Sequence, residues 1–161
     1  MRKTLVIGYG NTLRRDVGAG VAAAERLARD CPGASILTSQ ELHPEMVDEL
    51  AACTTAVFLD ASVRTSNVCV TRVLPVNGVH GAEGHALSPG DVLGLCSELY
   101  GHTPEEAIVV EIPAFECGFG DKMSAGTLRM VDRSVQLISE LLTGETTPEI
   151  LLHLAPSPAD D

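Results

Sequence analysis

Four polar side chains of this chain have residue types and positions that could serve chemistry: Asn11, Asp16, Asp60 and His85. Asn11 and Asp16 stand in a glycine-rich segment behind an apolar run, where they could meet a ligand. Asp60 ends a second apolar run, and His85 precedes the helix-start pattern Ser88-Pro89. One imidazole and one carboxylate suit a divalent transition metal, although a zinc-type site needs three or more protein ligands.

The segment that carries Asn11 and Asp16 runs from an expected strand into an expected helix. Residues 4–8 are predicted to form a buried strand, and the helix is predicted to begin near Asp16, which could serve as its N-cap. Loops of this kind lie at the carboxyl end of a strand, where α/β proteins place their ligand sites. Asp60 reaches the same edge of the sheet if its strand runs parallel to the first.

The glycines of this segment match no complete nucleotide-binding motif. Gly8-x-Gly10 is present, but the third glycine of a dinucleotide fingerprint is replaced by Leu13. No lysine follows in the manner of a P-loop. Two interpretations remain open from these residues: a structural turn whose glycines allow positive φ, and a phosphate- or nucleotide-binding α/β module.

Strands and helices alternate along most of the chain. The pattern predicts strands at 4–8, 35–38, 56–60, 67–74 and 107–112, and helices at 16–30, 44–53, 88–100 and 124–142. This order favours a mostly parallel sheet covered by helices on both faces. The strand at 67–74 has no helix before it, so we expect it to be antiparallel or to lie at an edge.

A single domain is predicted over residues 1–144, followed by a C-terminal tail. Residues 145–161 contain three prolines and end in two aspartates. Within this tail, residues 149–154 could form a short helical turn.

The composition excludes several classes of protein. Of the 161 residues, 45% are hydrophobic and only 3% aromatic, which predicts an aliphatic core. A net charge of −11 argues against binding to nucleic acid or to anionic membrane surfaces. No apolar run approaches the roughly 20 residues of a membrane span, and no secretory signal is recognisable, so a cytoplasmic protein is expected. The five cysteines form no CxxC pair and are expected to be reduced thiols.

Five segments taken together resemble the hydrogenase maturation endopeptidases, which trim the C-terminus of the large subunit of nickel–iron hydrogenases. These segments are 6–16 (VIGYGNTLRRD), 42–45 (LHPE), 58–61 (FLDA), 84–89 with 99–101 (GHALSP, LYG), and 112–124. The resemblance covers roughly residues 4–142. It implies a three-layer α/β/α sandwich with a mostly parallel central sheet of about five strands. It also implies an endopeptidase that removes the C-terminal peptide of the nickel-loaded large-subunit precursor.

The resemblance further implies that three residues contact the nickel carried by the precursor. Two of these positions match Asp60 and His85. The third is an acid directly before Gly-x-Gly, and this chain has Val17 there, which cannot coordinate a metal. Asp16 is taken as a partial substitute, and a nearby acid, Glu41 or Glu116, is the alternative.

The predicted catalytic and metal-contacting residues are therefore Asp16, Asp60 and His85. Gly10, Asn11 and His43 are predicted to contact the substrate. The metal arrives with the substrate, and zinc or cadmium could serve as surrogates for nickel in the purified protein. Metal-assisted peptide hydrolysis is the expected reaction.

Two further hypotheses stay open beside this one. Because Val17 removes a ligand, the chain could be a degenerate member that binds the precursor without cutting it. A generic metal-dependent amidase on a related fold would share Asp60 and His85 but would not prefer a nickel-loaded partner.

Overall fold

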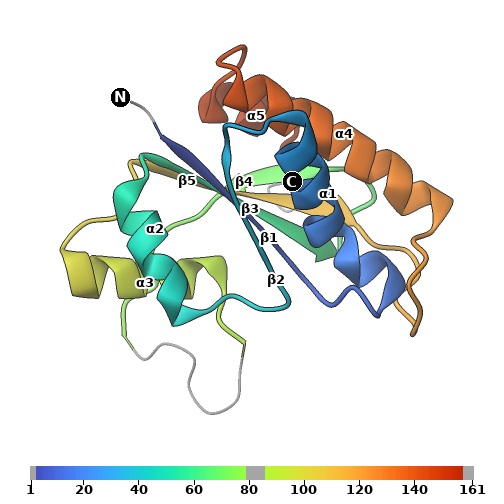
Figure 1. Ribbon diagram of the computed structural model, residues 1–161, viewed down its shortest axis with the longest axis horizontal. Coiled ribbons are helices and arrows are strands. Elements are labelled where there is room, and N and C mark those ends of the chain that lie inside the picture. The colour runs from blue at the N-terminus through green and yellow to red at the C-terminus, as the bar shows by residue number, and fades with distance from the viewer. Residues whose placement is uncertain (1–2, 79–85, 158–161) are drawn as a thin grey trace.

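A five-stranded sheet lies between two layers of helices in the computed structural model, which describes residues 3–78 and 86–157 (Figure 1). The strands are β1 (Thr4–Tyr9), β2 (Ser35–Ser39), β3 (Thr55–Ser62), β4 (Cys69–Arg72) and β5 (Glu106–Pro113), in the order β2-β1-β3-β5-β4. Four strands are parallel, and β4 pairs antiparallel with β5 at the edge. The predicted mostly parallel sheet with an antiparallel edge strand is confirmed.

Helices cover both faces of the sheet. α1 (Ala19–Asp30) and α4 (Ala125–Leu142) pack together on one face, while α2 (Val47–Ala52) and α3 (Pro89–Tyr100) lie on the other (Figure 1). The predicted three-layer α/β/α sandwich is therefore confirmed. Within the described residues, no helix combines the length and the apolar character needed to cross a membrane.

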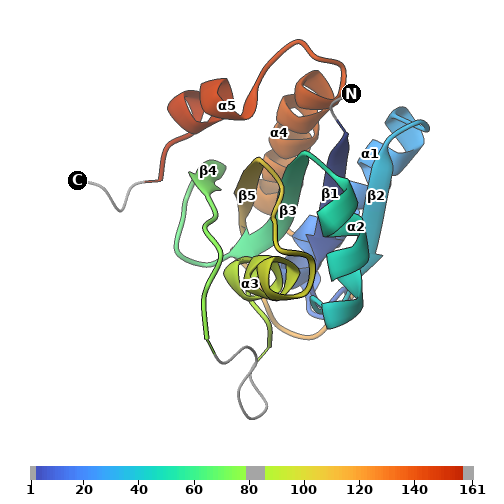
Figure 2. The same ribbon diagram turned by 90° about the vertical axis from the view of Figure 1, so that its left-hand side faces the viewer.

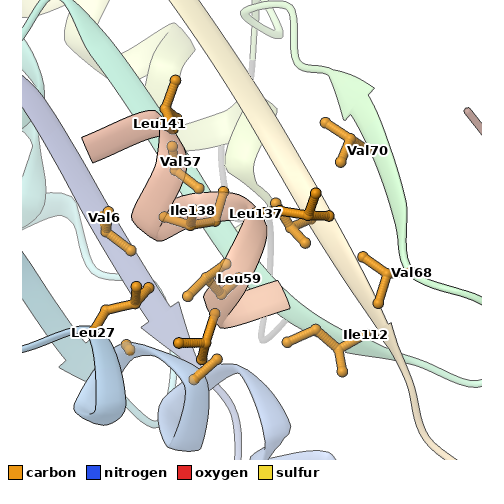
Figure 3. Close-up of a cluster of buried hydrophobic side chains, with 14 of the residues drawn as sticks. Val6, Leu27, Val57, Leu59, Val68, Val70, Ile112, Leu137, Ile138 and Leu141 are labelled. Carbon is orange, nitrogen blue, oxygen red and sulfur yellow. The ribbon is translucent and has the colours of Figure 1, made fainter. Parts of the chain in front are cut away.

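Alternate side chains of each strand enter two separate cores. Val57 and Leu59 face α1 and α4, in the cluster shown in Figure 3, whereas Ala56 and Phe58 face α2 and α3. Both clusters consist chiefly of aliphatic side chains, as the low aromatic content predicts. Because side chains on a strand alternate between faces, Asp60 lies on the same face as Phe58, above α2 and α3.

Two glycines allow α1 to lie directly on the sheet backbone. A Cβ atom at Gly20 would stand 2.2 Å from the carbonyl oxygen of Leu59, and one at Gly8 would stand 2.3 Å from the carbonyl oxygen of Gly20. Neither glycine has positive φ, whereas Gly10 has φ of 142°. The interpretation of these glycines as residues of positive φ is thus correct for Gly10 but wrong for Gly8. At Gly8 a glycine is needed because the backbone of α1 lies too close to admit a side chain.

We expect Gly20→Ala to lower the free energy of unfolding by about 3 kcal/mol, because α1 must move away from β3 to admit the methyl group. Gly33→Ala is the matched control, since a Cβ atom there meets nothing within 4 Å. Urea unfolding of both variants measures the difference. Equal stability of the two would contradict the close packing of α1 on β3.

Several predicted boundaries need correction. Asp16 is not the N-cap of α1: a 3₁₀ turn, Arg15–Gly18, comes first, and α1 begins at Ala19 without a side-chain cap. The helix predicted at 44–53 divides into a 3₁₀ turn, Pro44–Met46, and α2. β3 continues two residues beyond its predicted end, so Asp60 lies inside the strand. β4 is shorter than the predicted strand at 67–74.

The later helices follow their sequence signals closely. Ser88 and Asp91 form a reciprocal capping box at the start of α3, and Gly101 ends that helix with φ of 76°. Ser124 caps α4 by accepting a hydrogen bond from the amide of Thr127.

The C-terminal segment covers the edge of the sheet. α5 (Pro148–Leu154) lies beside β4 (Figure 2), and Leu151 is fully buried in the same cluster as α4. The backbone amide of Val70 donates a 2.6 Å hydrogen bond to the carbonyl oxygen of Ala155. The segment thereby protects an edge strand whose backbone would otherwise face water.

Candidate functional site

A pocket of about 340 Å³ opens at the carboxyl edge of the sheet. Asp60 of β3 lies in its wall together with residues 40–42 after β2, residues 86–87 before α3, and five residues at and after the end of β1: Tyr9, Gly10, Asn11, Arg14 and Val17. The parallel pairing of β1 with both β2 and β3 brings these segments together although they are far apart in the chain. Such an edge is where sheets of this kind place their ligands.

Asp60 is surrounded in this pocket by groups that disfavour its ionised form and groups that favour it. The Tyr9 hydroxyl donates a hydrogen bond to its carboxylate, and Glu111 stands opposite it on β5. Burial raises the pKa of Asp60 to about 6, and the charge of Glu111 adds to the rise while the Tyr9 hydrogen bond opposes it. At neutral pH the ionised Asp60 is therefore held close to a second acid and only partly solvated. A cation placed in the pocket would offset both the repulsion between Asp60 and Glu111 and the partial loss of solvation of the Asp60 carboxylate.

Asp16 is fully buried and does not line the pocket. Its Oδ2 atom accepts hydrogen bonds from the amides of Phe115 (2.9 Å) and Glu116 (2.8 Å) and from the hydroxyls of Ser124 (2.7 Å) and Thr127 (2.8 Å). Its Oδ1 atom accepts the amide of Ser124 at 2.8 Å. Burial raises the pKa of this carboxyl, but the hydrogen bonds from Ser124, Glu116 and Thr127 outweigh burial and hold the pKa far below its usual range.

This geometry gives Asp16 a structural task. It joins the segment after β1 to the loop that leads into α4, a hundred residues later in the chain. Because its oxygens are engaged and enclosed, the carboxylate has no free face to offer a metal ion. The arrangement does not favour the predicted metal-contacting role of Asp16.

Val17, the next residue, does line the pocket together with Asp60. The position at which the resemblance implies an acidic ligand is therefore at the pocket wall, but it carries an apolar side chain. Of the two alternative acids, Glu41 lines the same pocket, whereas Glu116 is paired with Arg15 at 2.6 Å. Among these acids Glu41 is the one placed to share a ligand with Asp60.

The remaining predicted residues divide between this pocket and other places. Gly10 and Asn11 line the pocket, and the Asn11 carboxamide oxygen accepts the amide of Leu13 at 2.9 Å. His43 is exposed and lines a neighbouring hollow of about 230 Å³ instead. His85 lies outside the described residues, although the next residue, Ala86, lines the pocket.

Within residues 3–78 and 86–157, no three histidine, cysteine, aspartate or glutamate side chains lie close enough together to hold a metal ion. All five cysteines are free thiols, as predicted. Asp60 and Glu41 therefore supply two potential ligands of the pocket from the described part of the chain.

Two residues close to Asp60, Tyr9 and Glu111, were not predicted from the sequence as residues of the site. Tyr9 lies two positions after Ile7 and so shares its face of β1, and Glu111 is a charged residue that interrupts the apolar run of β5 after residues 107–110. Burying a charge costs free energy, so a charged residue in the middle of a buried strand suggests a functional role. This was the feature of the sequence that could have identified Glu111. Nothing local marks Tyr9, because its partner comes from another strand.

Comparison with known proteins bears on this fold. No protein-family model and no curated protein matches the chain. Solved structures do match: the NiFe hydrogenase maturation protease HybD from Thermococcus kodakarensis has 21% identity and a TM-score of 0.64, covering 88% of this chain and 99% of that one. The hydrogenase maturating endopeptidase HybD from E. coli has 22% identity and a TM-score of 0.67, covering 89% and 94%. HycI from T. kodakarensis KOD1, also a NiFe hydrogenase maturation protease, has 23% identity and a TM-score of 0.68, covering 88% and 92%.

These matches define the class of the molecule: an α/β/α protein with the fold of the hydrogenase maturation proteases and a pocket at the carboxyl edge of its sheet. The resemblance drawn from the five sequence segments is confirmed at the level of the fold.

Proposed function

We propose that this chain is a peptidase that removes the C-terminal peptide of a nickel-loaded hydrogenase large-subunit precursor in the cytoplasm. The observation that carries the proposal is the placement of Asp60 and Val17 in one pocket at the carboxyl edge of a sheet with the fold of these proteases. Both are positions at which the sequence resemblance implies contact with the metal.

In the proposed reaction, the nickel of the precursor enters the pocket and contacts the Asp60 carboxylate and the His85 imidazole. The bound metal polarises either the scissile carbonyl or the attacking water. Gly10 and Asn11, which line the same pocket, hold the backbone of the substrate near Asp60. The hydroxyl of Tyr9 keeps the Asp60 carboxylate in one orientation through its hydrogen bond.

We propose Glu41 as the acid that takes the place of the missing ligand at Val17. It lines the pocket and follows β2, whose end lies beside that of β1. Its side chain is exposed, so it can turn toward an incoming metal without losing an internal partner. Asp16, by contrast, would have to give up its enclosed hydrogen bonds.

The proposal is tested by incubating purified protein with the nickel-loaded precursor and following release of the C-terminal peptide. Asp60→Ala and His85→Ala should each slow cleavage by about 100-fold or more, because each removes a direct contact to the metal. Asp132→Ala and His153→Ala are the matched controls, since both residues are exposed and lie outside the pocket. Normal cleavage by both the Asp60 and His85 variants would contradict the mechanism.

A degenerate protein that binds the precursor without cutting it is the second candidate, and Val17 in the pocket wall is the observation that favours it. In that case the wild-type protein binds the nickel-loaded precursor but releases no peptide. A phosphate-binding module is less well supported, because the first residues of α1 are buried against β1 and β3. Their amides are therefore unavailable to a phosphate group.

A further inference from the structure

An exposed aromatic side chain stands on a rigid part of the surface next to the pocket. Phe119 has 89% of its surface exposed, and the Arg14 guanidinium lies 5.4 Å from the centre of its ring. Leu13, which is 68% exposed, precedes Arg14 in the chain, and its backbone is hydrogen-bonded to Gly120, the residue after Phe119. We refer to Leu13, Arg14 and Phe119 as the aromatic ledge.

The backbone under the ledge is firmly held. The amide of Gly120 donates to the carbonyl of Leu13 at 2.8 Å, and the amide of Arg15 donates to the carbonyl of Gly120 at 2.9 Å. Asp16 ties the same two segments together from inside through its five hydrogen bonds. Single exposed apolar residues are common on protein surfaces, but those on loosely held loops can turn away from a partner. Here hydrogen bonds fix the backbone that carries Phe119 and Leu13, so both side chains stay exposed in one place, as contact residues of protein interfaces do.

The ledge is continuous with the candidate site. Arg14 contacts the ring of Phe119 on one side and lines the pocket that holds Asp60 on the other. Its Nε atom donates to the carbonyl of Cys117 at 3.3 Å, and its other guanidinium N–H groups have no hydrogen-bond partner in the described part of the chain. These groups are free to pair with a carboxylate brought by a ligand.

The distribution of charge on the protein indicates where a carboxylate of that ligand can bind. The chain carries a net charge of −11, so an acidic segment is repelled over most of its surface. Close to the ledge, Glu116 is neutralised by Arg15, while Asp121 and Lys122 are adjacent residues of opposite charge. Arg14 is thus the cation best placed to receive a carboxylate beside an apolar surface.

We propose that the aromatic ledge docks an extended segment of the protein substrate in which a large apolar side chain stands next to an acidic one. The apolar side chain packs on Phe119 and Leu13, and the acidic one pairs with Arg14. Docking here leads the neighbouring part of the substrate chain into the pocket with Asp60. The identity of the segment as part of the substrate rests on the proposed function, whereas its chemistry rests on the ledge alone.

The experiment measures binding without cleavage. Fluorescent dodecapeptides tiled along the hydrogenase large-subunit precursor, and the same peptides with every acidic residue replaced by lysine, are titrated with the purified protein. Peptides that combine a large apolar and an acidic residue should bind, and their lysine versions should bind about tenfold more weakly or not at all. Phe119→Ser and Arg14→Glu should each weaken the binding by about tenfold, as loss of an interface anchor does.

Matched variants separate docking from general effects on the surface. Leu154→Ser and Arg29→Glu change an exposed apolar and an exposed basic residue elsewhere and should leave binding unchanged. Phe119→Tyr should retain it. Arg14→Glu should also acquire binding to the lysine peptides, which a purely structural role of Arg14 would not produce.

Two outcomes overturn the proposal: no peptide binds the wild-type protein, or binding is the same in Phe119→Ser and Arg14→Glu as in the wild type. Release of the C-terminal peptide from the whole precursor is followed separately. A wild-type protein that binds peptides through the ledge but cleaves nothing would contradict the proposed peptidase activity and leave the docking surface intact.

Discussion

Asp16→Asn should lower the free energy of unfolding by about 4 kcal/mol, because a buried carboxylate that accepts several hydrogen bonds is replaced by a group that must turn N–H donors toward other donors. For a chain of this length the midpoint of thermal unfolding should fall by roughly 10 °C. Urea and thermal unfolding at neutral pH measure the loss. Amide hydrogen exchange at Phe115 and Glu116 should become faster, since both amides donate to Asp16.

The effect should depend on pH in a defined direction. The hydrogen bonds hold the pKa of the folded Asp16 carboxyl far below that of the unfolded chain, which is about 3.9. Its stabilising contribution is therefore complete above the unfolded pKa and is lost as the pH falls toward the folded pKa. The difference in stability between wild type and Asp16→Asn should be constant from about pH 8 to pH 5 and should narrow below about pH 4.

Asp132→Asn provides the control for this substitution. Asp132 pairs with Arg26 on the surface and its side chain is 66% exposed, so the change should alter stability by no more than about 0.5 kcal/mol. If Asp16→Asn were as stable as Asp132→Asn, the enclosed hydrogen-bond network around Asp16 would be wrong. Asp16 would then again be available as a metal ligand.

Val17→Glu should raise the affinity of the purified protein for cadmium, nickel or zinc by at least about tenfold, equivalent to about 1.4 kcal/mol. Val17 lines the pocket beside Asp60, so a carboxylate at this position joins Asp60 around the same space. Isothermal titration with each metal measures the change. Adding Asp60→Ala to Val17→Glu should remove the gain.

Two variants separate coordination from added size or charge. Val17→Gln has the same length without the charge, and Thr12→Glu adds the same charge at the wall of a neighbouring hollow that Asp60 does not line. Neither should bind the metals as Val17→Glu does. An unchanged affinity in Val17→Glu would indicate that the position is already filled, and loss of metal binding in Glu41→Ala would then identify Glu41 as the residue that fills it.

Local signals determined much of the architecture. The alternation of apolar strands with capped helices predicted the mostly parallel sheet, and the polar turn residues placed α3 and α4 almost to the residue. Ser88, Ser124 and Gly101 act through hydrogen bonds and backbone angles within a few residues of themselves, so their effects can be recognised in the sequence. Asp60 was recognisable for a similar reason, because a charge that follows four apolar residues marks the point at which a strand leaves the core, although β3 itself continues to Ser62.

The partners of the acidic residues were decided only by the tertiary structure. Asp16 has the spacing of a helix cap, but the donors that enclose it come from residues 115–127, and no local pattern connects the two segments. Tyr9 and Glu111 reach Asp60 from the two strands that flank β3, through the sheet register. Sequence thus determined which elements form and which edge carries the polar residues, whereas long-range packing decided that Asp16 turns into the protein and Val17 into the pocket. The physical reason is that capping and strand formation depend on neighbours in the chain, while burial and hydrogen bonding of a carboxylate depend on neighbours in space.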